Sequence, residues 1–138
     1  MPNVKVSMPG GGDEFINPGA VLTIREALPH EKNDSPEVKA TIRTGSGPLF
    51  AAESVSALRQ KFAESKLAEV TAPDGSRILV AMPRVTDCDK PTAQDHENAR
   101  AVLRFGPGAD APRQGVREPP DQLRPIWDAA GEPTAIFD

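Results

Sequence analysis

Tyrosine is absent from this chain, and aromatic residues make up only 4% of it. The core must therefore rest on Val, Ile, Leu and Ala. A single Cys cannot form an internal disulfide, so we expect no dependence on an oxidising compartment. A run of about 18 apolar residues, as a membrane-spanning helix requires, is also missing. We expect the few large aromatic side chains to complete the core: Phe15, Phe50, Phe62, Phe105, Phe137 and Trp127.

Clusters of Lys and Arg are missing as well. The formal net charge is −4 and the sequence pI is about 5.2. Because phosphate contacts dominate nucleic-acid affinity, an acidic chain without a basic stripe is a poor candidate for binding nucleic acid or an anionic membrane. Residues 1–8 are too short and too polar for a signal peptide. These features predict a soluble, intracellular protein.

What the chain does contain is turn-forming residues, since 15 Pro and 11 Gly account for 26 of the 138 positions. Such a composition predicts many turns and extended segments. The length suits one compact domain, or two small units that share a core.

Similar residues recur at fixed offsets along the chain. Val6, Pro9, Gly11 and Val21 precede Val70, Pro73, Gly75 and Val85 by 64 positions. Residues 40–47 match 101–108 at an offset of 61, and residues 58–62 match 123–127 at an offset of 65. This recurrence predicts a tandem duplication of a small β-unit. We expect a β-rich α+β fold with pseudo-two-fold symmetry and one shared core: a first unit at 1–66, a diverged second unit at 67–131, and an extended C-terminal tail at 132–138.

In the first unit, short β-branched runs flank the glycines at 10–12, which predicts a hairpin that ends before Pro18, followed by a strand at 20–24. Residues 29–37 are polar and predict a solvated loop. Val38 to Thr44 alternates like a half-buried strand that points Lys39, Thr41 and Arg43 outward, and a short strand is expected at 49–51. Ser54 is a candidate N-cap for a helix at 54–66, whose buried face would carry Val55, Leu58 and Phe62.

The second unit repeats this order with strands at 67–71 and 77–82 around the turn at 73–76. A polar loop at 90–98 and an alternating strand at 99–105 follow. Four prolines between 112 and 125 leave room for at most a short helix at 121–130, so we expect the second helix to be degraded or remodelled. Residues 134–138 should be extended.

Residues with possible chemistry are few. Gly10-Gly11-Gly12 lacks the Lys-Ser or Lys-Thr of a phosphate loop and is followed by two acids, so a hairpin turn is favoured. His30 and His96 occupy corresponding polar loops, but zinc-site spacing is absent, which favours solvated histidines. Cys88 lies between two Asp residues that disfavour its thiolate. We expect no catalytic residue, no metal, no cofactor and no small-molecule substrate.

The C-terminal part carries the candidate partner-binding residues. Apolar residues at a chain end, and a proline-rich segment at 107–125, suit docking on a partner in an extended conformation. The alternative is that both segments cover a poorly filled core of the same chain. The candidates are Pro119, Pro120, Trp127, Ile136 and Phe137.

The first unit resembles the FlbD and SwrD family of small flagellar and swarming-motility proteins, and similar short phage-encoded proteins. The resemblance covers about residues 3–65 and rests on 6–9, Phe15-Ile16-Asn17-Pro18, 21–24, 42–45 and Glu53-Ser54-Val55. The second unit has Ala81-Met82-Pro83 in place of Asn-Pro, and it lacks Glu-Ser-Val. What the family implies is a small β-rich domain with a C-terminal helix, no catalytic residues and an accessory interaction role.

Together these features predict a non-enzymatic structural or protein-interaction module that attaches to a larger assembly, with a protein partner or a homo-oligomer. A phage particle, of which the chain would be an accessory or decoration protein, is the first such assembly. The protein would then be located either free inside the cell or in a virus particle. Other functions left open are a motility-type regulatory protein that binds transiently and a small nucleic-acid-binding β domain.

Overall fold

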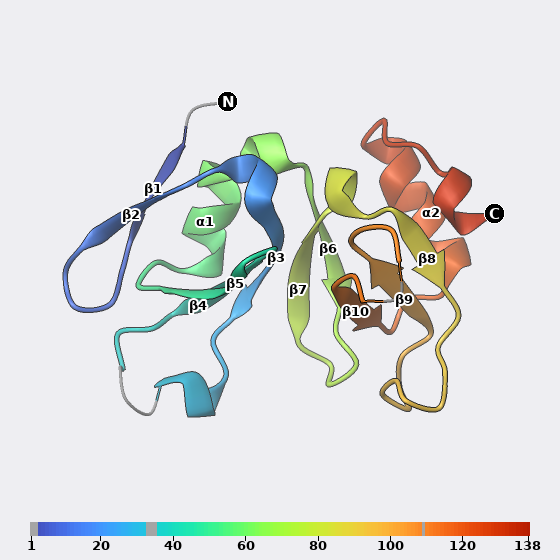
Figure 1. Cartoon of the computed structure of the whole chain (residues 1–138), viewed down its shortest axis with the longest axis horizontal. Helices are drawn as coiled ribbons and strands as arrows, with labels where there is room; N and C mark the ends of the chain where they lie inside the picture. The colour runs from blue at the N-terminus through green and yellow to red at the C-terminus, as the bar shows by residue number, and fades with distance from the viewer. Residues whose placement is uncertain (1–2, 33–35, 109) are drawn as a thin grey trace. The chain divides into compact units, whose positions relative to one another are not determined.

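The computed structural model describes residues 3–32, 36–108 and 110–138. The chain divides into two compact units, Met1–Leu67 (unit 1) and Ala68–Asp138 (unit 2). The described residues form ten β-strands and two α-helices, joined by short 3-10 turns (Figure 1). The predicted β-rich α+β class is therefore confirmed.

Unit 1 begins with the predicted hairpin, formed by β1 (Val4–Ser7) and β2 (Asp13–Ile16). The turn between them requires glycine, because Gly10 and Gly11 have φ values of +92° and +93°. As expected, β2 ends before Pro18, where the 3-10 turn η1 (Pro18–Ala20) begins.

The sheet of unit 1 contains β3 (Val21–Glu26), β4 (Ala40–Thr44) and β5 (Gly47–Ala51) in the antiparallel order β5-β4-β3. The 3-10 turn η2 (Pro29–Lys32) lies in the segment between β3 and β4. The prediction that β4 exposes its second face is wrong for Thr41, which is only 3% exposed. The physical reason is that Glu31 of η2 accepts a hydrogen bond from the Thr41 hydroxyl and covers it.

Helix α1 (Val55–Lys61) follows β5 and starts where the sequence predicts. The Ser54 hydroxyl accepts a hydrogen bond from the Ala57 N–H, and Leu58 and Phe62 are fully buried. The α-helix is shorter than the predicted 54–66, because its last part tightens into the 3-10 turn η3 (Ala63–Ser65) and Lys66 takes a left-handed conformation.

Unit 2 shows the same succession of elements. Strands β6 (Leu67–Thr71) and β7 (Arg77–Ala81) are neighbours joined by a tight turn, and the 3-10 turn η4 (Met82–Arg84) follows. Then come β8 (Asp87–Asp89), β9 (Ala101–Arg104) and β10 (Arg113–Val116), in the antiparallel order β10-β9-β8. Each unit therefore has a hairpin, a 3-10 turn, a three-stranded meander and a helix, in that order.

Helix α2 (Pro120–Ala129) lies within one residue of the predicted 121–130, but it is not degraded: it has ten residues, whereas α1 has seven. Pro119 and Pro120 occupy the N-cap and the first turn, where a missing N–H costs nothing. Pro125 lies inside the helix with its side chain exposed, while Leu123 and Trp127 are buried. Among the described residues, no helix has the length and apolarity needed to span a membrane.

The C-terminal tail is folded rather than extended. It ends in the 3-10 turn η5 (Ala135–Phe137), which packs against α2 and β8 of its own unit. The Phe137 ring meets the Trp127 ring edge-on at a centroid distance of 5.2 Å, and the Arg124 guanidinium binds the Asp138 carboxylate at 2.6 Å. The tail therefore docks within unit 2, because an aromatic edge contact and an ion pair hold it there.

Two of the aromatic residues expected in the core lie on the surface. Phe62, Phe105 and Trp127 are buried, but Phe15 is 64% exposed and Phe50 is 38% exposed. Strand pleating explains this result, because residues that alternate with the buried Ile16 and Ala51 must point to the other face. Both of these exposed rings belong to unit 1.

The packing of the tail can be tested with Trp127, the only Trp in the chain. We expect Phe137→Ala to shift the fluorescence of folded Trp127 to longer wavelength, because water reaches the indole edge, and to lower the free energy of unfolding by about 1–2 kcal/mol. Emission spectra and urea titrations provide the readouts. An unchanged spectrum would show that the tail does not rest on Trp127.

Candidate functional site

The predicted partner-binding residues all belong to unit 2. Pro119 and Pro120 start α2, Trp127 is only 1% exposed, and Ile136 and Phe137 are half-buried in η5. A side chain as deeply buried as Trp127 does not face a partner. The structure therefore brings Trp127 and Phe137 together within unit 2, and partner binding by the five residues stays a prediction.

The other candidates from the sequence are divided between the two units. The Gly10 N–H donates to the Glu37 carboxylate at 2.8 Å, so an acid stands where a phosphate would have to bind. His30 and His96 are both exposed, and the His96 Nδ1 accepts a hydrogen bond from the Asn98 N–H. Within the described ranges, no group of three His, Cys, Asp or Glu residues is placed to hold a metal ion.

Cys88 lies half-buried in β8. Burial, and secondarily the negative charge of Asp89, raise the pKa of its thiol to about 11. The thiol is therefore protonated at neutral pH, which is unsuited to a nucleophile.

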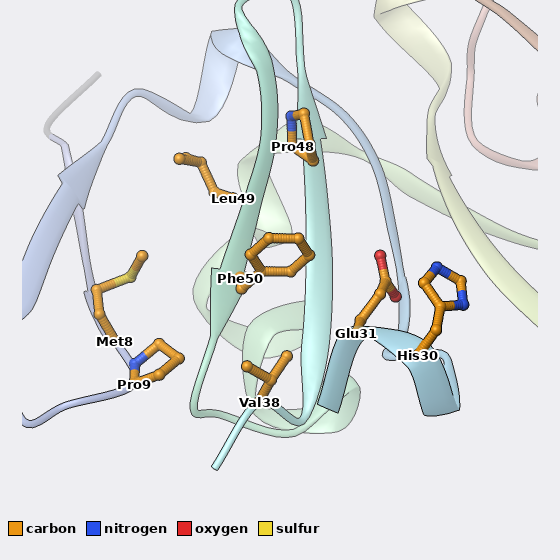
Figure 2. A pocket seen from close by; sticks show the side chains of 8 residues that line it. All are labelled: Met8, Pro9, His30, Glu31, Val38, Pro48, Leu49 and Phe50. Atoms are coloured by element: carbon orange, nitrogen blue, oxygen red, sulfur yellow. The ribbon is translucent and has the colours of Figure 1, made fainter. Parts of the chain in front are cut away.

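A groove of about 650 Å³ opens on unit 1 around the exposed ring of Phe50 (Figure 2). Figure 2 shows the ring in front of β4 and β5, with Met8 and Pro9 on one side and His30 and Glu31 on the other. Sequence reasoning placed Phe50 in the core and so missed this surface. Six of the lining residues are apolar: Met8, Pro9, Val38, Pro48, Leu49 and Phe50.

Backbone geometry leaves Phe50 at an open edge of the sheet. A two-residue loop joins β4 to β5, so Thr44 and Gly47 form a hydrogen-bonded pair, and such pairs alternate along the hairpin. Phe50, opposite Thr41, falls at a position that does not bond to β4. Its N–H and C=O therefore point away from β4, toward the outer edge of β5.

One side of the groove is bounded by the Glu31 carboxylate, which is almost fully engaged. It accepts hydrogen bonds from Arg25 Nη1 and Nη2 at 2.9 and 3.0 Å, from the Leu28 N–H at 2.8 Å and from the Thr41 hydroxyl at 3.0 Å. Burial alone would raise the pKa of Glu31, but these hydrogen bonds and the charge of Arg25 outweigh it, so the pKa lies below its usual value. Its charge is thus balanced within unit 1.

A glutamate pins the end of the first strand in both units. In unit 1 the Glu53 carboxylate accepts the Ser7 N–H at 2.8 Å, and in unit 2 the Glu118 carboxylate accepts the Thr71 N–H at 2.9 and 3.0 Å. The residue before each glutamate donates its N–H back to Ser7 or Thr71, in both cases at 2.8 Å. Sequence reasoning missed Glu118, although it follows Glu53 by 65 positions, the offset that also relates Leu58 to Leu123.

At the corresponding place in unit 2, smaller side chains let a proline pack against the sheet. A Cβ added to Gly115 would lie 3.3 Å from both Ala99 Cβ and Pro73 Cγ. The Pro73 carbonyl is further held by Arg117 Nε at 2.9 Å. At the repeat offsets, Gly115, Ala99 and Pro73 are the counterparts of Phe50, Val38 and Pro9.

Comparison of the chain with models of protein families, with curated proteins and with solved structures finds no match. The resemblance of the first unit to the FlbD and SwrD family therefore stays a prediction.

The Glu31 network predicts a pH-dependent stability. Because its pKa is lowered by folding, Glu31 stabilises the protein above its usual pKa of 4.5, and this contribution is lost as the pH falls through the folded value. Glu31→Gln should cost about 1–3 kcal/mol at pH 7 and flatten the loss of stability below pH 4.5. Urea titrations from neutral to acid pH measure both, with the exposed Glu26→Gln as control. Equal curves for Glu31→Gln and wild type would contradict the assignment.

Cys88 should react slowly with thiol reagents. A thiol pKa of about 11 instead of 9.0 lowers the thiolate fraction about 100-fold at neutral pH. Alkylation by iodoacetamide, followed by mass spectrometry, should be slower by that order than for a free cysteine. Asp89→Asn should speed it only slightly, because burial is the larger cause of the shift. A rate equal to that of free cysteine would contradict the buried, protonated thiol.

Proposed function

We propose that this chain is a non-enzymatic protein-interaction module that attaches to a larger assembly through the Phe50 groove of unit 1. The observation that carries this proposal is the contrast between the two units. Both of the large apolar side chains that the described residues expose belong to unit 1, whereas the apolar tail of unit 2 is packed against Trp127. A groove with an exposed aromatic ring is typical of a docking surface.

The titratable groups support a role without catalysis. Burial raises the pKa of Glu53, but the hydrogen bond from Lys61 and that from the Ser7 N–H outweigh it and leave the pKa lowered. The Thr92 N–H, together with Arg113, lowers the pKa of Asp95. A general acid or base works best with a pKa near neutrality, and these contacts move the carboxyl groups away from it. Each shift is accounted for by a contact that holds a loop or a strand end in place.

We also infer that the two units arose by duplication of one β-unit. The shared succession of elements, the identical strand order of the two meanders and the paired glutamate contacts support this inference. The two copies would then have separate roles. In unit 2 Pro73 packs beside Gly115, whereas in unit 1 the surface at the corresponding Phe50 would serve for binding.

The assembly that we propose first is a phage particle, in which this chain would be an accessory or decoration protein. Its support is the resemblance of residues 3–65 to short phage-encoded and motility proteins. A stoichiometric, long-lived partner agrees with this role, whereas a weak and rapidly exchanging partner would favour a motility-type regulator.

Affinity capture from a lysate of the organism that encodes the chain tests the docking surface. Because a buried aromatic contact is worth about 2 kcal/mol or more, we expect Phe50→Asp to lose roughly 30-fold in partner affinity. The exposed Gln60→Asp on α1 is the matched control and should behave like wild type. Capture that is unaffected by Phe50→Asp but lost with Phe137→Ala would place the docking surface on the tail instead.

A further inference from the structure

The occupant of the groove can be specified further, on the premise that the groove is the docking surface proposed above. We propose that it binds an uncharged, extended segment of a partner protein, which lies beside β5 and pairs with the backbone of Phe50. Backbone geometry, groove chemistry, charge and the corresponding place in unit 2 support this assignment independently.

Backbone geometry limits the pairing to a short stretch of β5. The free edge of β5 offers the N–H and C=O of Phe50, but Pro48 has no N–H to donate. Beyond Phe50, the Ala52 N–H already donates to the Ser7 carbonyl at 2.8 Å. A partner strand can therefore form two hydrogen bonds at Phe50 and donate a third to the Pro48 carbonyl, so side-chain contacts must supply most of the affinity.

Those contacts are apolar. Residues opposite each other on neighbouring strands point to the same face, so the residue paired with Phe50, and those two positions from it, would enter the groove. There they would meet Met8 and Pro9 on one side and Phe50 with Val38 on the other (Figure 2). An unbranched Met side chain adapts its shape to different apolar partners. Medium-sized apolar side chains therefore suit this space.

Charge selects against ionised residues in the segment. Glu31 is the only carboxylate among the residues that line the groove, and Arg25 binds it in a two-bond contact. A charged partner residue buried here would lose its hydration without gaining an ion pair, which is unfavourable. The groove is complementary to a neutral segment.

Unit 2 shows what lies at the equivalent place. Pro73 follows the edge of β6 and packs its ring on Gly115 and Ala99. The occupant of that place is thus an apolar side chain carried by a non-helical segment. In unit 1 the larger Phe50 and Val38 stand at these positions, and the remaining space is available to a segment from another protein.

A second copy of the chain is the competing occupant. Two β5 strands related by a two-fold axis could pair Phe50 with Phe50, but Pro48 and the engaged Ala52 would limit the ladder to two bonds. Self-association is therefore an outcome to be measured alongside peptide binding.

The test selects random dodecapeptides, displayed on a surface, against the full-length chain and then measures the affinity of the selected peptides as synthetic compounds. We expect a central stretch without Asp, Glu, Lys or Arg and at least a tenfold loss of affinity with Phe50→Asp or Phe50→Ala. Methylation of the peptide nitrogen that pairs with Phe50 should weaken binding to a similar extent. Gln60→Asp should bind like wild type, and circular dichroism with urea titration reports that each variant is folded.

Several outcomes would overturn the inference. One is the selection of a charged central motif or of no peptide, and another is equal binding to wild type and Phe50→Asp. A dimer in sedimentation experiments that Phe50→Asp dissociates would assign the groove to a second copy. If a lysate partner is nevertheless lost with Phe50→Asp, the proposed docking surface stands and only the identity of its occupant is wrong.

Discussion

The arrangement of each unit depends on one contact, a glutamate carboxylate that accepts the backbone N–H at the end of the first strand. Glu53 holds Ser7 in unit 1, and Glu118 holds Thr71 in unit 2. Each glutamate directly precedes the N-cap of the helix, so the contact joins the hairpin to the start of the helix. The residue before the glutamate donates its N–H to the same hairpin residue, which ties the hairpin to the end of β5 or β10 as well. In unit 1 this fixes where Met8 and Pro9 stand beside β5, and thereby one side of the groove.

The two units share this arrangement of strands and helix but differ in surface beside the third strand of the meander, because a few side chains differ in size. Gly115 and Ala99 admit Pro73 in unit 2, whereas Phe50 and Val38 prevent such packing in unit 1. Unit 2 also holds the tail through the Trp127 ring. In the account proposed above, unit 2 contributes a self-contained structure, and the exposed apolar surface is left to unit 1.

Much of the local structure could be predicted from the sequence, because its signals are short-range. Ser54 with Leu58 and Phe62 predicted the start of α1, and the glycine turn predicted the first hairpin. The surface position of Phe50 was missed because the short sequence of β5 does not show which of its alternating residues face the core. That depends on the strands and helices that pack on each face of the sheet. The Glu31 network was missed since its partners come from two strands, and Glu118 was overlooked because Pro119 and Pro120 replace the serine and valine of the first unit.

The most direct test is an amide NMR spectrum of the isotopically labelled full chain, titrated with the partner recovered by affinity capture. The account predicts that shift changes concentrate at Met8, Val38 and Phe50, while the indole N–H of Trp127 stays in place. Changes at Trp127 and in the tail, with Phe50 unaffected, would contradict it and show that the tail, and not the groove of unit 1, meets the partner.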